Sequence, residues 1–109
     1  MAYDEQLAGR VRELIGARTG VSERKMFGGI GFMIGGNMAV GVIGEDLIVR
    51  LDPADAEEAL AEEGVREFDF TGRPMKGWIF VGPEAAAEDQ SFAGWVDAGA
   101  DFATSLPSK

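Results

Sequence analysis

Close to half of the chain's 16 glycines lie in one apolar stretch, residues 24–51, and this stretch limits the possible folds more than any other. Within it, runs of valine, isoleucine, methionine and phenylalanine are interrupted by Gly35 to Asn37 and by Gly44 to Asp46. Glycine and asparagine tolerate the positive φ angles that tight hairpin turns require. Short turns join neighbouring strands, and strands joined in this way are antiparallel. The stretch therefore predicts a three-stranded antiparallel meander.

Apolar residues at helical spacing predict one helix before this meander and two helices after it. The first spans residues 3–18 and is followed by Gly20, a residue typical of a left-handed helix cap. The second begins at Pro53, because proline suits the first helical position, and ends before Gly64. The third, residues 89–105, carries a stripe of aromatic and aliphatic residues that must be buried.

Two further strands are predicted at residues 65–70 and 76–81, where the apolar residues alternate with other side chains. The resulting order is α-β-β-β-α-β-β-α, which is an α+β fold with an antiparallel sheet of about five strands and helices packed on it. At 109 residues we expect a single domain, 1–109. Gly31 and Gly41 lie inside the predicted strands. Their missing side chains predict close packing on one face, which we expect to be the packing of a helix.

The composition limits the catalytic and metal-binding side chains that this protein has. The chain has neither cysteine nor histidine, so it lacks the thiol nucleophile, the commonest general base and the commonest transition-metal ligand. Residues 51–109 carry the whole of the net charge of −9. That sign disfavours binding to nucleic acid, which is driven by neutralisation of phosphates. The acidic half either keeps the protein soluble or forms a face that meets a basic protein partner.

No cofactor or metal is predicted. The glycine-rich stretch lacks a dinucleotide fingerprint, because Ile34 stands where the third glycine belongs and a turn follows in place of a helix. The amino terminus has no signal pattern, and no apolar run approaches the length of about 20 residues that a membrane helix needs. We therefore expect a cytoplasmic protein without a membrane segment.

The segment from Thr71 to Trp78 is the strongest candidate for binding, because it places Arg73 and Lys76 beside an aromatic ring. Two cations and an aromatic ring suit a carboxylate or a phosphate. Alternatively the segment only connects two strands, and Arg73 pairs with an acidic residue of the preceding strand. Arg50 is a second candidate, because it interrupts an apolar strand. It lies on a solvated sheet face, makes a buried ion pair, or joins an anion site.

Four segments resemble, in this order, the amino-terminal domain of the TfoX (Sxy) family, and the resemblance covers nearly the whole chain. These segments are Lys25–Met33, Asn37-Met38, Leu47–Arg50 and Phe68–Trp78. The resemblance implies a fold akin to secretion chaperones and a cytoplasmic bacterial protein. Full-length members are regulators of natural competence that act with the cyclic-AMP receptor protein through protein contact. They carry a second, helical domain, whereas this sequence stops at Lys109, so we expect a stand-alone amino-terminal domain.

The resemblance supplies no catalytic residues. The main hypothesis is therefore a non-enzymatic protein-interaction domain, whose partner belongs to the transcription machinery and meets the sheet or the 71–78 segment. The alternative is a small anionic-ligand-binding domain or a minor enzyme that uses Arg50, Arg73 and Lys76. Direct nucleic-acid binding is disfavoured, because it requires a basic patch on an acidic body, built from Arg10, Arg12, Arg18, Arg24 and Lys25. A homodimer through an uncovered strand edge is compatible with this fold.

Overall fold

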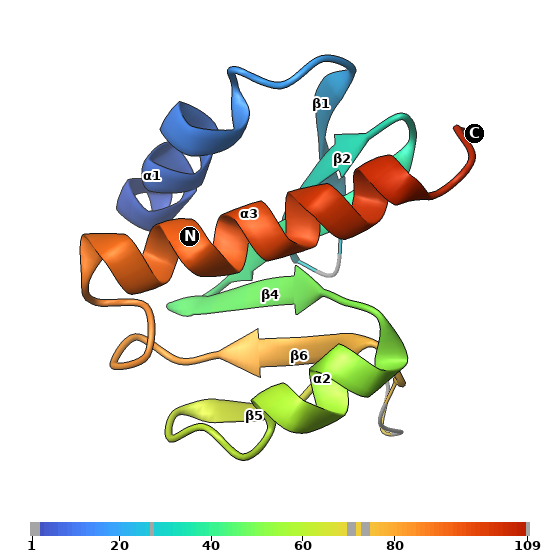
Figure 1. Cartoon of the computed structure of the whole chain (residues 1–109). Coiled ribbons are helices and arrows are strands. Elements are labelled where there is room, and N and C mark those ends of the chain that lie inside the picture. Colours follow the sequence, from blue (N-terminus) through green and yellow to red (C-terminus); the bar gives the residue numbers. More distant parts are fainter. Residues whose placement is uncertain (1–2, 27, 70–71, 73–74, 109) are drawn as a thin grey trace.

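The computed structural model of the chain describes residues 3–26, 28–69, 72 and 75–108. These residues form an antiparallel sheet of six strands in the order β1-β2-β3-β4-β6-β5, together with three helices (Figure 1). The strands are β1 (Val21–Met26), β2 (Gly29–Ile34), β3 (Asn37–Ile43), β4 (Asp46–Arg50), β5 (Val65–Glu67) and β6 (Trp78–Val81). The helices are α1 (Glu5–Ile15), α2 (Pro53–Ala59) and α3 (Asp89–Ser105).

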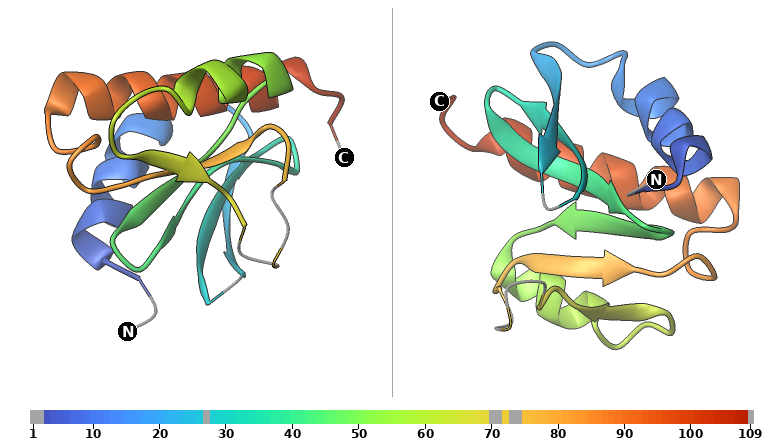
Figure 2. Two further views of the ribbon diagram at one scale, coloured as in Figure 1. Left: turned by 90° about the horizontal axis from the view of Figure 1, so that it is seen from below. Right: turned by 180° about the vertical axis from the view of Figure 1, so that it is seen from behind.

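The helices gather on one side of the sheet, where they bury the main core. Figure 2 shows α2 and α3 lying over the same face, and α1 packs against α3 and β3. The core beneath them includes Val11, Phe32, Val40 and Val49, none of which is exposed to solvent. Complete burial of such side chains contributes roughly 1.5–3 kcal/mol each, so this layer supplies most of the folding energy.

The opposite side of the sheet, here called the back face, carries a second apolar cluster. In the described part of the chain no helix crosses this face (Figure 2, seen from behind). Met38, Ile48, Phe68 and Phe80 are buried there. The partly buried side chains packed around them are Met26, Met33, Ile43, Met75 and Trp78. The back face is thus closed by its own side chains and by the chain that follows β5.

The fold class predicted from the sequence is confirmed, with one strand more than expected. The third helix has the predicted bounds, and α2 begins at Pro53 as predicted. The additional strand is β1, which forms an edge of the sheet and exposes four successive residues, 22–25. An edge strand with both sides in solvent needs no apolar alternation, so its sequence gives no strand signal. The meander consequently has four strands, from β1 to β4.

Several predicted elements are shorter in the structure. Helix α1 begins at Glu5 because the Asp4 carboxylate caps it, accepting hydrogen bonds from the backbone N–H groups of Gln6 and Leu7. It ends at Ile15, and residues 16–18 are not helical. Strand β5 stops at Glu67, where the prediction continued to residue 70, and residue 70 itself lies outside the described residues.

The expectation that Gly31 and Gly41 accommodate a helix is wrong. A Cβ atom on Gly41 would lie 2.5 Å from Cε of Met38, and one on Gly31 would lie 3.1 Å from Sδ of Met26. Both glycines therefore make room for methionine side chains of the back face. The close approach of a helix to the sheet uses a glycine of the helix, because a Cβ on Gly99 would lie 2.5 Å from the Ala39 carbonyl oxygen.

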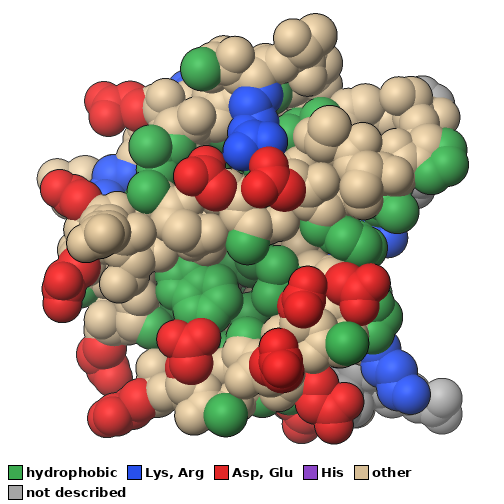
Figure 3. All heavy atoms as spheres, in the orientation of Figure 1, with side chains coloured by type: hydrophobic (Ala, Val, Ile, Leu, Met, Phe, Trp, Pro, Cys, Tyr) green, Lys and Arg blue, Asp and Glu red, His purple; other side chains and the backbone are tan. Residues whose placement is uncertain are grey.

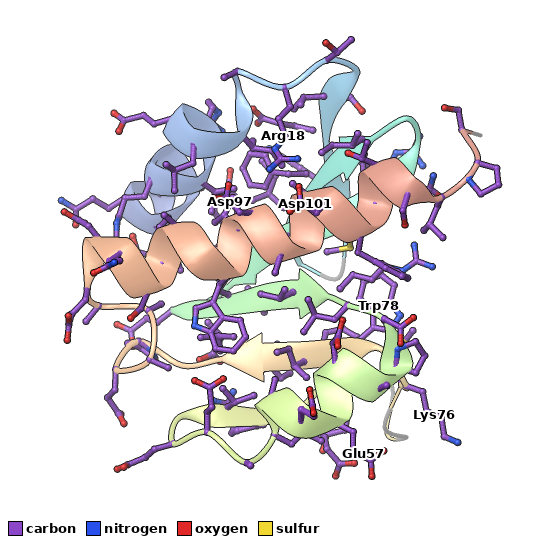
Figure 4. The ribbon with its side chains drawn as sticks, in the orientation of Figure 1. Arg18, Glu57, Lys76, Trp78, Asp97 and Asp101 are labelled. Carbon is purple, nitrogen blue, oxygen red and sulfur yellow. The ribbon has the colours of Figure 1, made fainter. Side chains whose placement is uncertain are left out.

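Four arginines connect separate segments of the fold through ion pairs. Arg12 binds both carboxylate oxygens of Glu23 at 2.7 and 2.8 Å and so links α1 to β1. Arg18 lies between Asp97 and Asp101 of α3, with contacts of 3.5 and 2.9 Å (Figure 4). The other two pairs are Arg10–Asp89 and Arg66–Asp46. Much of the small number of basic side chains thus forms ion pairs within the protein.

We expect the Arg12–Glu23 pair to stabilise the protein only above acidic pH. The hydrogen bond and charge of Arg12 hold the pKa of Glu23 below its ordinary value. The stabilisation is complete above the ordinary glutamate pKa of about 4.3 and is lost as pH falls through the lowered pKa of the folded state. Because the pair is exposed, Glu23→Gln should lower the free energy of unfolding at pH 7 by about 0.5 kcal/mol.

Urea denaturation at pH 7 and at pH 3 measures this difference. At pH 3 the wild type and the Glu23→Gln variant should unfold at closer urea concentrations than at pH 7. Glu13→Gln, an exposed substitution on α1 next to Arg12, serves as the control and should show no such convergence. A difference of the same size at both pH values would contradict the assignment of the pH dependence to Glu23.

Candidate functional site

Three of the five site residues predicted from the sequence lie within the described chain, and the structure brings them together. Lys76 and Trp78 line a cleft of about 450 Å³ between α2 and β6, and Arg50 lies against the ring of Trp78. Thr71 and Arg73 lie outside the described residues. We call this hollow the Trp78 cleft; its lining residues are Pro53, Ala54, Ala56, Glu57, Leu60, Glu67, Met75, Lys76, Gly77, Trp78 and Ile79.

Local backbone geometry places the two walls of the Trp78 cleft. Asp52 accepts a hydrogen bond from the backbone N–H of Ala54 at 3.0 Å and so starts α2 directly after β4. On the other wall Gly77 has a φ of +87°, and a Cβ there would lie 2.8 Å from the Leu51 carbonyl oxygen. The Leu51 N–H donates to the Gly77 carbonyl at 2.7 Å. Only glycine fits at this point, and it holds the start of β6 against the end of β4.

Trp78 contacts an aromatic ring and a guanidinium group. Its ring centroid lies 5.9 Å from that of Phe68, and the guanidinium carbon of Arg50 lies 5.1 Å from the Trp78 ring centre. Arg50 also lies 5.7 Å from the ring centre of Phe102 on α3. Such cation–π contacts contribute about 0.5–1 kcal/mol each at partly exposed sites. Arg50 therefore joins β4, β6 and α3 through aromatic rings.

The buried ion pair considered for Arg50 is not found among the described residues, which show no carboxylate within bridging distance of its guanidinium. Arg50 is partly buried, so a fully solvated position is not observed either. Its role as an anion ligand stays a prediction. A free N–H of this guanidinium would be the donor in that case.

The charged groups of the Trp78 cleft stand at its rim. Glu57, Glu67 and Lys76 are exposed, and Figure 4 shows the Lys76 and Glu57 side chains pointing outward from the protein body. Two carboxylates and one ammonium make the described rim unfavourable for a phosphate or carboxylate. Most of the other lining side chains are apolar. The described part of the cleft therefore suits an apolar group with polar surroundings better than a small anion.

Sequence reasoning missed the wall that α2 contributes. The sequence predicts a helix that begins at Pro53, but Pro53, Ala54 and Leu60 lie some twenty residues before Trp78 in the chain, and no pattern in the sequence places them beside it. Their proximity depends on the pairing of β4 with β6, which sets Arg50 opposite Trp78. The one available signal was the run Leu51-Asp52-Pro53, which starts a helix at the end of a strand and so places it beside the neighbouring strand.

The described residues contain no cluster of three or more acidic side chains placed to hold a metal ion. No helix in that part of the chain is long and apolar enough to cross a membrane. The titratable groups that line the Trp78 cleft are two carboxylates, Glu57 and Glu67, and the amine of Lys76, all exposed. The arrangement can bind, and the cleft offers an aromatic and a thioether surface for that purpose.

Comparison with known proteins bears on this part of the chain. The family model described as the TfoX N-terminal domain matches residues 13–103. The match includes the entire sheet and every residue that lines the Trp78 cleft. Comparison with curated proteins and with solved structures gave no match.

Proposed function

The chain belongs to the TfoX N-terminal domain family, and from this premise we propose that it is a non-enzymatic protein-interaction domain that regulates transcription. In this proposal it acts in the cytoplasm and contacts a component of the transcription machinery through its own side chains. The observation that carries the proposal is the Trp78 cleft, an open apolar hollow within the matched region. The absence of histidine and cysteine from the sequence makes catalysis a poorer explanation of this cleft.

The composition of the Trp78 cleft is that of a protein-binding surface. Aromatic residues and methionine are enriched at the centre of protein–protein interfaces, and charged residues gather at the rim. Here Trp78 and Met75 lie among apolar neighbours, while the glutamates and Lys76 stand outside them. A partner would insert an apolar side chain between α2 and β6. The flexible thioether of Met75 would adapt to its shape.

Protein contact is also the mode of action that the charge of the chain favours. A net charge of −9 repels the phosphates of DNA. At a promoter the domain would therefore act by contacting another protein that binds the DNA. Arg12 and Arg18, which a nucleic-acid surface would have needed, are paired with carboxylates. Arg10 is paired in the same way, with Asp89.

A carboxylate placed in the Trp78 cleft should abolish partner binding. Ala54 is exposed and lines the cleft near the start of α2, where a negative charge is compatible with the helix dipole, so Ala54→Glu should leave the fold intact. We expect affinity purification of the tagged protein from its host lysate to recover a defined partner. Ala54→Glu should reduce that recovery at least roughly tenfold, as expected for a charge buried without a partner at an interface.

Ala61→Glu is the matched control, because Ala61 is exposed just beyond α2 and does not line the Trp78 cleft. It should leave the recovery unchanged. Equal recovery with Ala54→Glu and with the control would show that the cleft is not the docking site. Turnover of a defined metabolite by the purified wild type, lost in Ala54→Glu, would overturn the non-enzymatic assignment.

A further inference from the structure

A second groove lies on the helical side of the sheet, separate from the Trp78 cleft. It has a volume of about 600 Å³ and lies between the turn that follows α2, the β6–α3 connection and α3. Its charged lining residues are Glu62, Glu63, Glu84 and Glu88, and Trp95 of α3 is its aromatic residue. Figure 3 shows apolar side chains in the hollow between α3 and α2, with acidic side chains around it. We call this surface the Trp95 groove.

The turns after α2 and after β6 bring these glutamates together. The Gly82 N–H donates to the Gly64 carbonyl at 2.8 Å, and a Cβ on Gly64 would lie 3.0 Å from Cβ of Ala85. Gly64 also has a φ of +86°, which a side chain would strain. These contacts set Glu62 and Glu63 beside the segment that carries Glu84. The Trp95 groove is therefore a property of the folded chain, built by two glycine-dependent turns.

Trp95 is held in place while part of its surface stays accessible. It is partly buried and packs against the main core. On α3 the small residues Gly94 and Ala98 line the groove beside it. An accessible indole face attracts a cation within about 6 Å of its centre. The groove thus offers an aromatic contact for a positively charged side chain.

The glutamates of the Trp95 groove have no basic partner in the described structure. The ion pairs there engage Arg10, Arg12, Arg18 and Arg66, and each of these binds an acidic residue outside the groove. Arg50 lies against Trp78 and Phe102. Four carboxylates around one hollow repel one another, and a cationic occupant would relieve that repulsion.

We propose that the Trp95 groove binds a basic segment of a partner protein, with one lysine or arginine over the indole of Trp95 and others paired with the four glutamates. The residues of α3 in the groove run from Ser91 to Ala98, about 10 Å along the helix axis. That length accommodates about three residues of extended chain. The occupant is therefore a short run of lysine and arginine. This surface is distinct from the Trp78 cleft, so the inference is independent of the proposed function.

Titration calorimetry with a defined probe tests this inference. The probe is a synthetic peptide with blocked ends that contains three consecutive arginine or lysine residues between glycines. It should bind the wild-type protein saturably, with one peptide for each chain, at low ionic strength. Affinity should fall at least tenfold at about 1 M salt, where the screening length is about 3 Å. Absence of saturable binding at low salt would overturn the proposal.

A charge-matched pair of variants separates local binding from the overall charge. The groove variant carries Glu62→Gln, Glu63→Gln, Glu84→Gln and Glu88→Gln, and should bind the peptide at least tenfold more weakly. The control variant removes four exposed charges elsewhere, through Glu13→Gln, Glu45→Gln, Glu58→Gln and Asp69→Asn. It should lose less than twofold. Equal losses in both variants would mean that only long-range attraction acts, and the proposal would fail.

Two further measurements define the occupant. Trp95→Leu keeps an apolar side chain but removes the ring, and should weaken peptide binding about threefold to fivefold, as expected for one exposed cation–π contact. Should that variant fold poorly, the groove and control variants above decide the question.

Spermine that bound as tightly as the peptide would make the groove a polyamine site and overturn the assignment to a protein segment. Ala54→Glu, which lies in the Trp78 cleft, should leave peptide affinity unchanged.

Discussion

Replacing Phe68 with alanine should lower the free energy of unfolding by about 4 kcal/mol, a large part of the roughly 5–15 kcal/mol expected for a domain of this size. Phe68 follows β5 and has no exposed surface. Its ring centroid lies 4.9 Å from that of Phe80 and 5.9 Å from that of Trp78. Because no helix of the described chain covers the back face, nothing large can move in to fill the space that Phe68 leaves.

Urea denaturation followed by tryptophan fluorescence measures this loss. Phe68→Leu retains most of the volume and should cost only about 1 kcal/mol. Leu14→Ala is the surface control, because Leu14 is 39% exposed, and it should change stability by less than about 0.5 kcal/mol. A loss below about 1 kcal/mol for Phe68→Ala would show that the back-face cluster contributes little to folding.

Replacing Gly99 with alanine should also destabilise the protein, by about 2 kcal/mol. The added Cβ would approach the Ala39 carbonyl oxygen to 2.5 Å and Cγ1 of Val40 to 2.8 Å. The carbonyl belongs to β3 in the centre of the sheet and cannot yield, so α3 has to move outward. Overpacking of this kind costs about 1–3 kcal/mol, and it outweighs the gain of roughly 1 kcal/mol in helix propensity.

The same substitution elsewhere on α3 provides the control for this effect. Gly94 lies on the solvent side of the helix, and a Cβ there meets nothing within 4 Å. Gly94→Ala should therefore stabilise the protein by about 0.5–1 kcal/mol through helix propensity alone. Thermal denaturation of both variants would show opposite shifts in Tm. Shifts of the same sign would mean that α3 does not approach β3 as closely as the structure indicates.

The sequence predicts those helices and strands in which the burial of one side gives a periodic pattern of apolar residues. Helix α3 has the predicted bounds because its buried residues Phe92, Val96, Ala100 and Ala103 repeat at steps of three and four. Strand β1 escapes prediction because its central residues are polar and exposed. Its place in the sheet depends on pairing with β2, and that partnership leaves no periodic trace in the sequence of an edge strand.

The two surfaces show the same limit. The sequence places Lys76 and Trp78 in one candidate site because they are two residues apart. Helix α2 lies beside them only because β4 pairs with β6 in the sheet. The Trp95 groove was missed entirely, since its glutamates come from two segments about twenty residues apart. Runs of glutamate in a sequence resemble any solvated surface. The Gly82–Gly64 hydrogen bond and the close approach of Gly64 to Ala85 make these particular carboxylates neighbours.

The character of the two edge strands has a consequence for the behaviour of the protein at high concentration. Strand β1 presents Glu23, Arg24 and Lys25 in succession, and β5, at the other edge, is only three residues long. Charges on an edge and short edge strands both oppose the addition of further strands, which is the first step of amyloid growth. Together with the net charge of −9, they should keep the concentrated protein dispersed. Any pairing of two copies is then expected to join faces of the molecule and to leave each sheet at its own width.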